Sequence, residues 1–288
     1  ICLAHFLLIS DYLIFLKRTI MNISNLKKAT AIFLGLSVSV LSSNAQAALI
    51  DVAGLTHLWS GEGNANDSVG IVNGTLGANT VFATGLSGQA FSFDGSQNAI
   101  TTFPVNISPG SLPQMTVGMY INVDSIVNNR GWLLGHDNGG YDRALMISDD
   151  RFGSRLSAAP GGTYTSNLTD FSSNLDKWFG IAVAYDQINS SAIVYVNDLQ
   201  GNSTIQTITT NLSSGLGIFS LGGQTQYGGH TVDAIVDELF IYDRALSQAE
   251  LDIAFTSVFS LSTLALVGLV VLGVFGLIRL IFLGYYPV

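Results

Sequence analysis

Two adjacent carboxylates, Asp237 and Glu238, interrupt an apolar stretch near the C-terminal end of the chain. If this stretch is an extended strand, neighbouring side chains point to opposite faces, with Leu239 beside Asp237 and Phe240 beside Glu238. One carboxylate must then point into an apolar layer. A buried carboxylate without a partner is very costly, so it requires a cation or several hydrogen bonds. The candidate partners are a metal ion, Arg244 in a salt bridge with Asp237, and backbone N–H groups.

The other carboxylates and the histidines form no catalytic pattern. Retaining glycosidases place two carboxyl groups about 5 Å apart, a separation that residues i and i+2 of a strand supply. Asp149 and Asp150 are adjacent and would point apart, while Asp233 and Asp237 are four residues apart. The histidines lack metal-ligand spacing, and no Gly-x-Ser-x-Gly motif is present (His5, His57, His136 and His230). We therefore expect no enzyme, and a glycosidase with unusual carboxylates is kept only as an outlier.

Three loops have the composition of a sugar-binding site, because they combine aromatic and polar side chains with turn-forming residues. These loops cover residues 136–143, 160–164 and 226–230. The candidate ligand-binding residues in them are Asp137, Asn138, Tyr141, Arg143, Tyr164 and Tyr227. Turn formation alone accounts for similar compositions, so both interpretations remain open here.

Charge and cysteine content exclude several classes of partner and bond. Residues 48–256 contain nineteen Asp and Glu against six Lys and Arg, a net charge of −13. Without a basic stripe, nucleic acid and anionic lipid are poor partners. The excess of carboxylates is compatible with Ca²⁺ binding, although solubility is the commoner explanation for such an excess. The only cysteine, Cys2, lies outside this region, so no disulfide is expected within it.

The region of residues 48–256 consists of short alternating runs that end at Gly, Asn, Asp and Ser. In four runs, apolar residues recur at every second position: Phe91 and Phe93; Val117, Met119, Ile121 and Val123; Ile181, Val183 and Tyr185; and Val194 and Val196. Trp59 and Trp178 lie within strand patterns and are assigned to the core, whereas the position of Trp132 is ambiguous. This pattern predicts an all-β, antiparallel two-sheet jelly-roll sandwich.

Helical periodicity is nearly absent from the same region. Ser247 and Glu250 form a capping-box pattern, which predicts one short C-terminal helix after Leu246.

The N-terminal end has the pattern of a secretory signal. The first Met is Met21, and it is followed by two lysines, an apolar run and Ala45-Gln46-Ala47. We expect a signal peptide at residues 21–47, cleaved after Ala47, and upstream mistranslation at residues 1–20. The alternative is a true N-terminal membrane anchor.

The C-terminal end carries a long uncharged segment. Residues 259–278 contain no charge and are long enough to cross a bilayer as a helix, which takes about 20 residues. Arg279 follows where a cytoplasmic charge is expected. We therefore expect a C-terminal transmembrane helix within residues 257–288, with a buried core helix as the alternative. The protein is expected to be exported and anchored in the bacterial membrane, facing the periplasm or the cell surface.

This tail resembles the PEP-CTERM sorting signal of exopolysaccharide-producing bacteria. The stretch Ser262-Thr263-Leu264-Ala265-Leu266-Val267-Gly268 matches the apolar part of that signal. Residues 258–261 stand where the Pro-Glu-Pro motif is expected, and the basic cluster is reduced to Arg279. Permanent anchoring is therefore expected rather than cleavage by a sorting protease.

Residues 55–255 resemble the laminin-G-like (concanavalin A-like) lectin–glucanase superfamily. The matching elements occur in the family's order: Leu58-Trp59 with the acidic loop to Ser68, then 73–75, 88–95, 178–186, 193–197 and the closing stretch 236–251. Members often hold a structural calcium ion between the opening loop and the closing strand. The resemblance therefore implies Ca²⁺ bound by Asp67, Asn73 and Asp237, with Glu62 as a substitute ligand.

The resemblance and the tail together imply a carbohydrate-binding or adhesive module of the bacterial cell envelope. Its partner would be a polysaccharide, such as the cell's own exopolysaccharide, or a cell-surface or matrix component, with membrane attachment through the C-terminal helix. The alternative is a structural envelope protein that makes protein contacts without a sugar site.

Overall fold

The computed structural model describes residues 52–127, 130–136, 143–148, 157–160, 169–210, 217–226 and 230–255. The segments expected to form the signal peptide and the C-terminal anchor lie outside these residues. In the part of the chain that is described, no helix is both long and apolar enough to cross a membrane.

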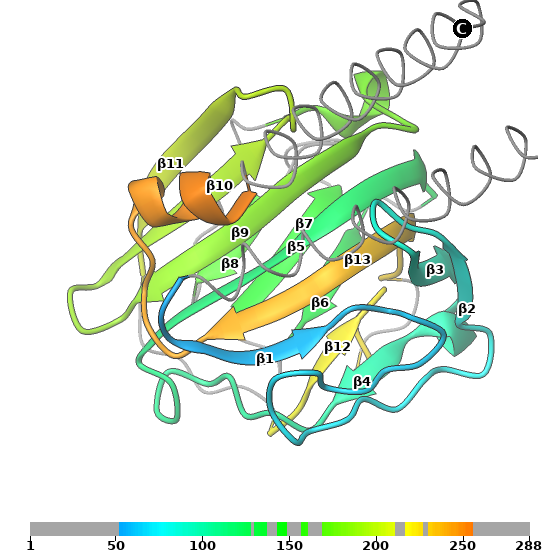
Figure 1. The fold of residues 1–288 in the computed structure, drawn as a ribbon, viewed down its shortest axis with the longest axis horizontal. Helices are drawn as coiled ribbons and strands as arrows, with labels where there is room; N and C mark the ends of the chain where they lie inside the picture. The colour runs from blue at the N-terminus through cyan, green and yellow to red at the C-terminus, as the bar shows by residue number, and fades with distance from the viewer. Residues whose placement is uncertain are drawn as a thin grey trace, which may run out of the picture. The chain divides into compact units, whose positions relative to one another are not determined.

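The described residues form two antiparallel sheets (Figure 1). The eight-stranded sheet has the order β11-β10-β9-β5-β13-β3-β2, with β1 also paired to β13. Its strands are β1 (Leu55–Trp59), β2 (Val81–Thr84), β3 (Gln89–Asp94), β5 (Gln114–Ser125), β9 (Trp178–Asp186), β10 (Ser191–Asn197), β11 (Ser203–Thr209) and β13 (Asp233–Tyr242). The five-stranded sheet has the order β4-β12-β6-β7-β8. Its strands are β4 (Thr101–Phe103), β6 (Gly131–Gly135), β7 (Arg143–Ser148), β8 (Ser157–Pro160) and β12 (Phe219–Leu221). The predicted two-sheet sandwich is confirmed.

The main hydrophobic core lies between the two sheets. All the alternating apolar residues predicted from the sequence belong to it, from Phe91 on β3 to Val196 on β10. Trp59 is fully buried there, as expected, and its ring contacts Phe103 and Phe219 on the five-stranded sheet. The assignment of Trp178 to this core is wrong. It is only partly buried and packs against the hydrophobic cluster on the outer face of the larger sheet, because the next residue of β9, Phe179, faces the core between the sheets.

A bulge in β13 changes which residues face the core. The register against β5 shifts between Asp237 and Phe240, and Glu238 has a φ of 50°. Val236 before the bulge and Leu239 after it both enter the core between the sheets, whereas Phe240 packs on the outer face. The strict alternation expected across Asp237 and Glu238 is therefore wrong, because an extra residue in a strand reverses the facing of everything beyond it.

The bulge lies where β13 exchanges one neighbour for another. Along one edge, residues Asp233–Val236 pair with β3, and residues Leu239–Tyr242 pair with β1. β1 and β3 thus follow one another along β13 (Figure 1). Asp237 and Glu238 sit at the gap between them.

The short C-terminal helix forms at residues 248–255, as the capping box predicted. The N–H of Ser247 donates to Glu250 Oε2 over 2.9 Å, and the Glu250 carboxylate also accepts from Arg244 over 2.8 Å. Phe255 at the helix end contacts the rings of Tyr120 and Tyr195 on the outer face of the larger sheet. Two further 3-10 turns, at Gln97–Ala99 and Phe171–Ser173, connect strands.

Gly180 makes this helix docking possible, since a Cβ at Gly180 would lie 2.3 Å from the Phe255 ring. We expect Gly180→Ala to lower the free energy of unfolding by about 1–3 kcal/mol, because overpacking forces Phe255 out of its contact. Urea unfolding measures the change. Gly110→Ala is the matched control, because nothing lies within 4 Å of its Cβ position. Equal stability of the two variants would contradict the prediction.

Candidate functional site

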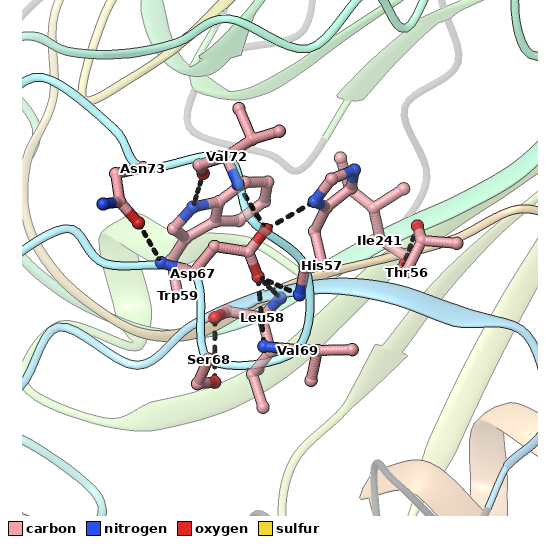
Figure 2. Close-up of polar contacts among 11 residues, drawn as sticks. Thr56, His57, Leu58, Trp59, Asp67, Ser68, Val69, Val72, Asn73 and Ile241 are labelled. Carbon is pink, nitrogen blue, oxygen red and sulfur yellow. Dashed lines mark hydrogen bonds and ion pairs between the residues drawn. The ribbon is translucent and has the colours of Figure 1, made fainter.

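The first candidate site is the loop that follows β1, and Asp67 lies at its centre (Figure 2). Its side chain is fully buried, and Oδ2 lies 2.6 Å from Nδ1 of His57. The remaining partners are backbone N–H groups, which donate to the carboxylate from Leu58 (3.1 Å), Val69 (3.2 Å), Gly70 (2.8 Å) and Val72 (3.2 Å). The loop is thus wrapped around one carboxylate.

These contacts act on the charge of Asp67 in opposite directions. Burial raises its pKa, but the hydrogen bonds from His57 and the backbone outweigh burial, so the pKa is lowered overall. Asn73 also holds the loop in place, because its Oδ1 accepts the backbone N–H of Asp67 over 3.0 Å. Asp67 and Asn73, two of the four predicted calcium ligands, therefore already serve as hydrogen-bond acceptors that shape the loop.

The loop is also joined to the core through aromatic rings. His57 stacks on Trp59 with 5.1 Å between ring centroids, and the Trp59 indole N–H donates to the Val72 carbonyl over 2.8 Å. The Asp67 network therefore connects the loop to β1 and to the centre of the sandwich.

The second candidate site is the carboxylate pair at the β13 bulge. Asp237 is fully buried, and Glu238 is 3% exposed. The N–H of Ser87 donates to Asp237 Oδ2 over 3.0 Å, while Asp237 Oδ1 has no hydrogen-bond partner within the described residues. Ser60 Oγ donates to Glu238 Oε2 over 2.9 Å. Of the two alternatives to a metal ion, the salt bridge from Asp237 to Arg244 is wrong, since Arg244 pairs with Glu250 near the helix, whereas a backbone N–H does donate to Asp237.

Both carboxyl groups at the bulge hold their protons unusually well. Burial raises the pKa of Asp237 to about 8, and repulsion from Glu238 adds to the rise. Burial likewise raises the pKa of Glu238 to about 7, against the hydrogen bond from Ser60. Glu62 is exposed, accepts the Gln89 N–H over 3.2 Å and repels both groups electrostatically. Ser60 was missed in the sequence, because it lies 178 residues from Glu238 along the chain and only the fold brings the two together. Glu238 was recognised as a candidate buried carboxylate but was not named as a ligand.

The four predicted calcium ligands fall into two places. Asp67 and Asn73 hold the opening loop, whereas Glu62 and Asp237 lie at the bulge. Within the described ranges, no group of three or more His, Cys, Asp or Glu side chains is arranged to hold a metal ion. The Asp67 carboxylate, with five donors around it, is a poor fit to a cation, and the unpaired Oδ1 of Asp237 is the better one.

The third candidate site is one end of the five-stranded sheet. β6 ends at Gly135, β7 begins at Arg143 and β8 ends at Pro160, and the last two residues are cross-strand partners. Because the three strands are antiparallel neighbours, the loops after β6 and after β8 leave the same end of the sheet. Of the predicted sugar-binding residues, Arg143 is described and fully buried. The others lie outside the described residues (Asp137, Asn138, Tyr141, Tyr164 and Tyr227).

An aromatic cluster covers the outer face of this smaller sheet. Trp132, only 2% exposed, packs with Ala144 and Met146, and its ring stacks on His230 with 5.7 Å between centroids. The sequence placed His230 in a candidate loop but did not connect it with Trp132, since the two are 98 residues apart. The contact joins the loop before β13 to β6.

Solved structures with a similar fold have low sequence identity to this chain. Domain 4 of AbnA, a GH43 extracellular arabinanase from Geobacillus stearothermophilus in complex with arabinotriose, is 18% identical, with a TM-score of 0.52 over 70% of this chain and 98% of that one. The binding domain of Paraclostridial Mosquitocidal Protein 1 is 15% identical, with a TM-score of 0.56 over 76% and 53%. The botulinum neurotoxin serotype D ligand-binding domain, in complex with N-acetylneuraminic acid, is 15% identical, with a TM-score of 0.54 over 72% and 52%.

These likenesses show a shared fold, and the chain spans about half the length of the last two structures. No curated protein sequence matches the chain. A sequence profile described as the concanavalin A-like lectin/glucanases superfamily matches residues 94–252. This match covers more than half of the chain, so the protein belongs to the concanavalin A-like lectin/glucanases superfamily.

Proposed function

We propose that this protein is a carbohydrate-binding module of the bacterial cell envelope, exported through residues 21–47 and held in the membrane by residues 257–288. The observation that carries the proposal is that the end of β6, the start of β7 and the end of β8 lie at the same end of the five-stranded sheet. That end joins the two loop segments in which the sequence places Tyr141 and Tyr164 among polar residues. Two structures with this fold, the arabinanase domain and the serotype D toxin domain, are complexes with sugars.

Binding without catalysis is the form of the proposal that the carboxylates support. A glycosidase must bring two carboxyl groups to the glycosidic bond. Asp237 and Glu238 have the raised pKa of acid catalysts, but both are buried at the gap between β1 and β3, where a polysaccharide does not reach them. We therefore propose a binding protein, whose ligand is an envelope or matrix polysaccharide.

Calorimetry of the purified chain with a panel of polysaccharides, in calcium and again in chelator, tests the proposal. We expect saturable binding to at least one glycan, weakened at least about tenfold by Tyr141→Ala or Tyr164→Ala, because aromatic faces stack on sugars. Ile71→Ala is the control: Ile71 is 96% exposed in the opening loop, so binding should persist. Absence of binding to every glycan by the folded protein would overturn the proposal.

A protein-contact role is the second candidate, and the opening loop favours it. Val69 and Ile71 in the opening loop and Val81 at the start of β2 expose apolar side chains, and Ile71 is almost fully exposed. Exposed apolar groups of this kind occur at protein interaction sites. If no glycan binds and Ile71→Ala abolishes association with an envelope component, this role replaces the first.

A further inference from the structure

Arg143 is a buried cation at the end of the core between the sheets. It is the first residue of β7 and shares the inward face of that strand with Leu145 and Ile147, both of which belong to the core. Its side chain is fully buried, which is rare for arginine unless the charge is paired.

The guanidinium group of Arg143 has too few partners for its place in the core. Nη1 donates to the carbonyl of Ile107 over 2.6 Å, and Cζ lies 4.8 Å from the centroid of the Tyr185 ring. Nε and Nη2 have no hydrogen-bond partner within the described residues, and neither has the buried hydroxyl of Tyr185. Three donor groups on two neighbouring buried side chains therefore remain unsatisfied in the core.

Arg143 keeps its charge despite this burial. Burial lowers its pKa to about 10, so the group stays protonated at neutral pH. Its positive charge also partly offsets the rise that burial causes in the pKa of Tyr185, as expected for close neighbours. A buried cation whose N–H groups lack acceptors is strongly destabilising, so an anion is the missing component.

The geometry of the free donors selects the kind of anion. Nε and Nη2 lie on one edge of the planar guanidinium, where their N–H bonds run parallel and match the two oxygens of a carboxylate. A single negative charge balances the single positive charge. We propose that Arg143 and Tyr185 form an internal carboxylate-binding site, in which the guanidinium edge grips both oxygens and the Tyr185 hydroxyl donates a third hydrogen bond. The site is independent of the proposed glycan site, because it faces the core.

Thermal unfolding of the full chain at pH 7 tests the site, with sodium acetate compared with sodium chloride at equal ionic strength. We expect acetate to raise the melting temperature by several degrees beyond chloride, because a ligand that binds only the folded state stabilises it. Titration of ¹³C-labelled acetate followed by NMR gives the dissociation constant. Tyr185→Phe, which removes one donor and keeps the ring, should weaken acetate binding several-fold.

Arg143→Lys keeps the charge but loses the fork, and it should weaken acetate binding at least about tenfold. Arg244→Lys is the matched control, since Arg244 lies at the surface in a pair with Glu250, and acetate binding should be unchanged. Should Arg143→Lys fail to fold, Tyr185→Phe still decides. Equal effects of acetate and chloride on the unaltered chain, or unchanged acetate binding in Tyr185→Phe and Arg143→Lys, would overturn the site. Tyr141→Ala should leave acetate binding intact, so failure of the glycan proposal is distinguishable.

Discussion

Replacing Asp67 with Ala is expected to lower the free energy of unfolding by about 3–5 kcal/mol, because the change removes the acceptor around which the opening loop is built. Four backbone N–H groups and the ring of His57 donate to this one carboxylate. Without it, the N–H groups of a partly buried loop lose their only acceptor in the network of Figure 2. Asp67→Asn keeps one oxygen acceptor and should therefore lower the free energy of unfolding by less than Asp67→Ala does.

Chemical denaturation measures this effect, and Asp198→Ala is its matched control. Asp198 also accepts two backbone N–H bonds, from Gln200 and Asn202, but in an exposed turn where water replaces it. We expect Asp198→Ala to lower the free energy of unfolding by less than about 1 kcal/mol. A loss of similar size in Asp67→Ala would show that the network contributes little.

The pH dependence of the Asp67 contribution has a definite sign. The folded-state pKa of Asp67 is lowered, so its contribution is present above the unfolded-state value near 4 and is lost as the pH falls through the folded-state pKa. The stability deficit of Asp67→Ala should therefore shrink in acid.

Replacing Asp237 with Asn is expected to stabilise the protein at pH 8 and to remove most of its loss of stability between pH 5 and pH 8. The pKa of Asp237 is raised to about 8, against about 4 in an unfolded chain. The folded state then holds a proton that the unfolded state has released, so stability falls as the pH rises from about 4 to about 8. Glu238, with a pKa of about 7, adds to the fall. The expected loss in the unaltered chain is on the order of several kcal/mol.

Melting curves at pH 5 and pH 8, in chelator, measure this dependence. Asp243→Asn is the control, because Asp243 is exposed just beyond β13, and its change should leave the pH dependence as it is. A flat stability profile in the unaltered chain would contradict the prediction.

Calcium gives the same experiment a second arm. If an ion occupies the bulge, calcium raises the melting temperature more at pH 8, where the carboxylates are ionised, than at pH 5, and Asp237→Asn loses the effect. A melting temperature that chelator leaves unchanged would rule out a structural calcium ion.

Much of the fold was predictable because alternation along a strand is a local property. The four runs from Phe91 to Val196 face the core as their spacing requires, and the Ser247–Glu250 pair begins the helix. Trp178 was assigned to the core because it lies within a strand pattern, but that pattern does not say which face of the strand packs against the other sheet. The side chains beyond Asp237 were assigned to the wrong faces of the sheet. The bulge that reverses them arises where β13 pairs with β5, β3 and β1, and the residues of β13 alone do not reveal it.

The fold family was recognised from the resemblance of residues 55–255 to the superfamily. The two-sheet architecture followed from short-range alternation, and the acidic, cysteine-free character of the domain followed from composition. The burial, hydrogen-bond partners and pKa of each charged group follow only from the tertiary structure. It surrounded Asp67 with donors, raised the pKa of Asp237 and Glu238 at a gap between strands, and buried Arg143 beside Tyr185. Desolvation and hydrogen bonding depend on which segments distant in the sequence are in contact, and the spacing of residues along the chain does not specify those contacts.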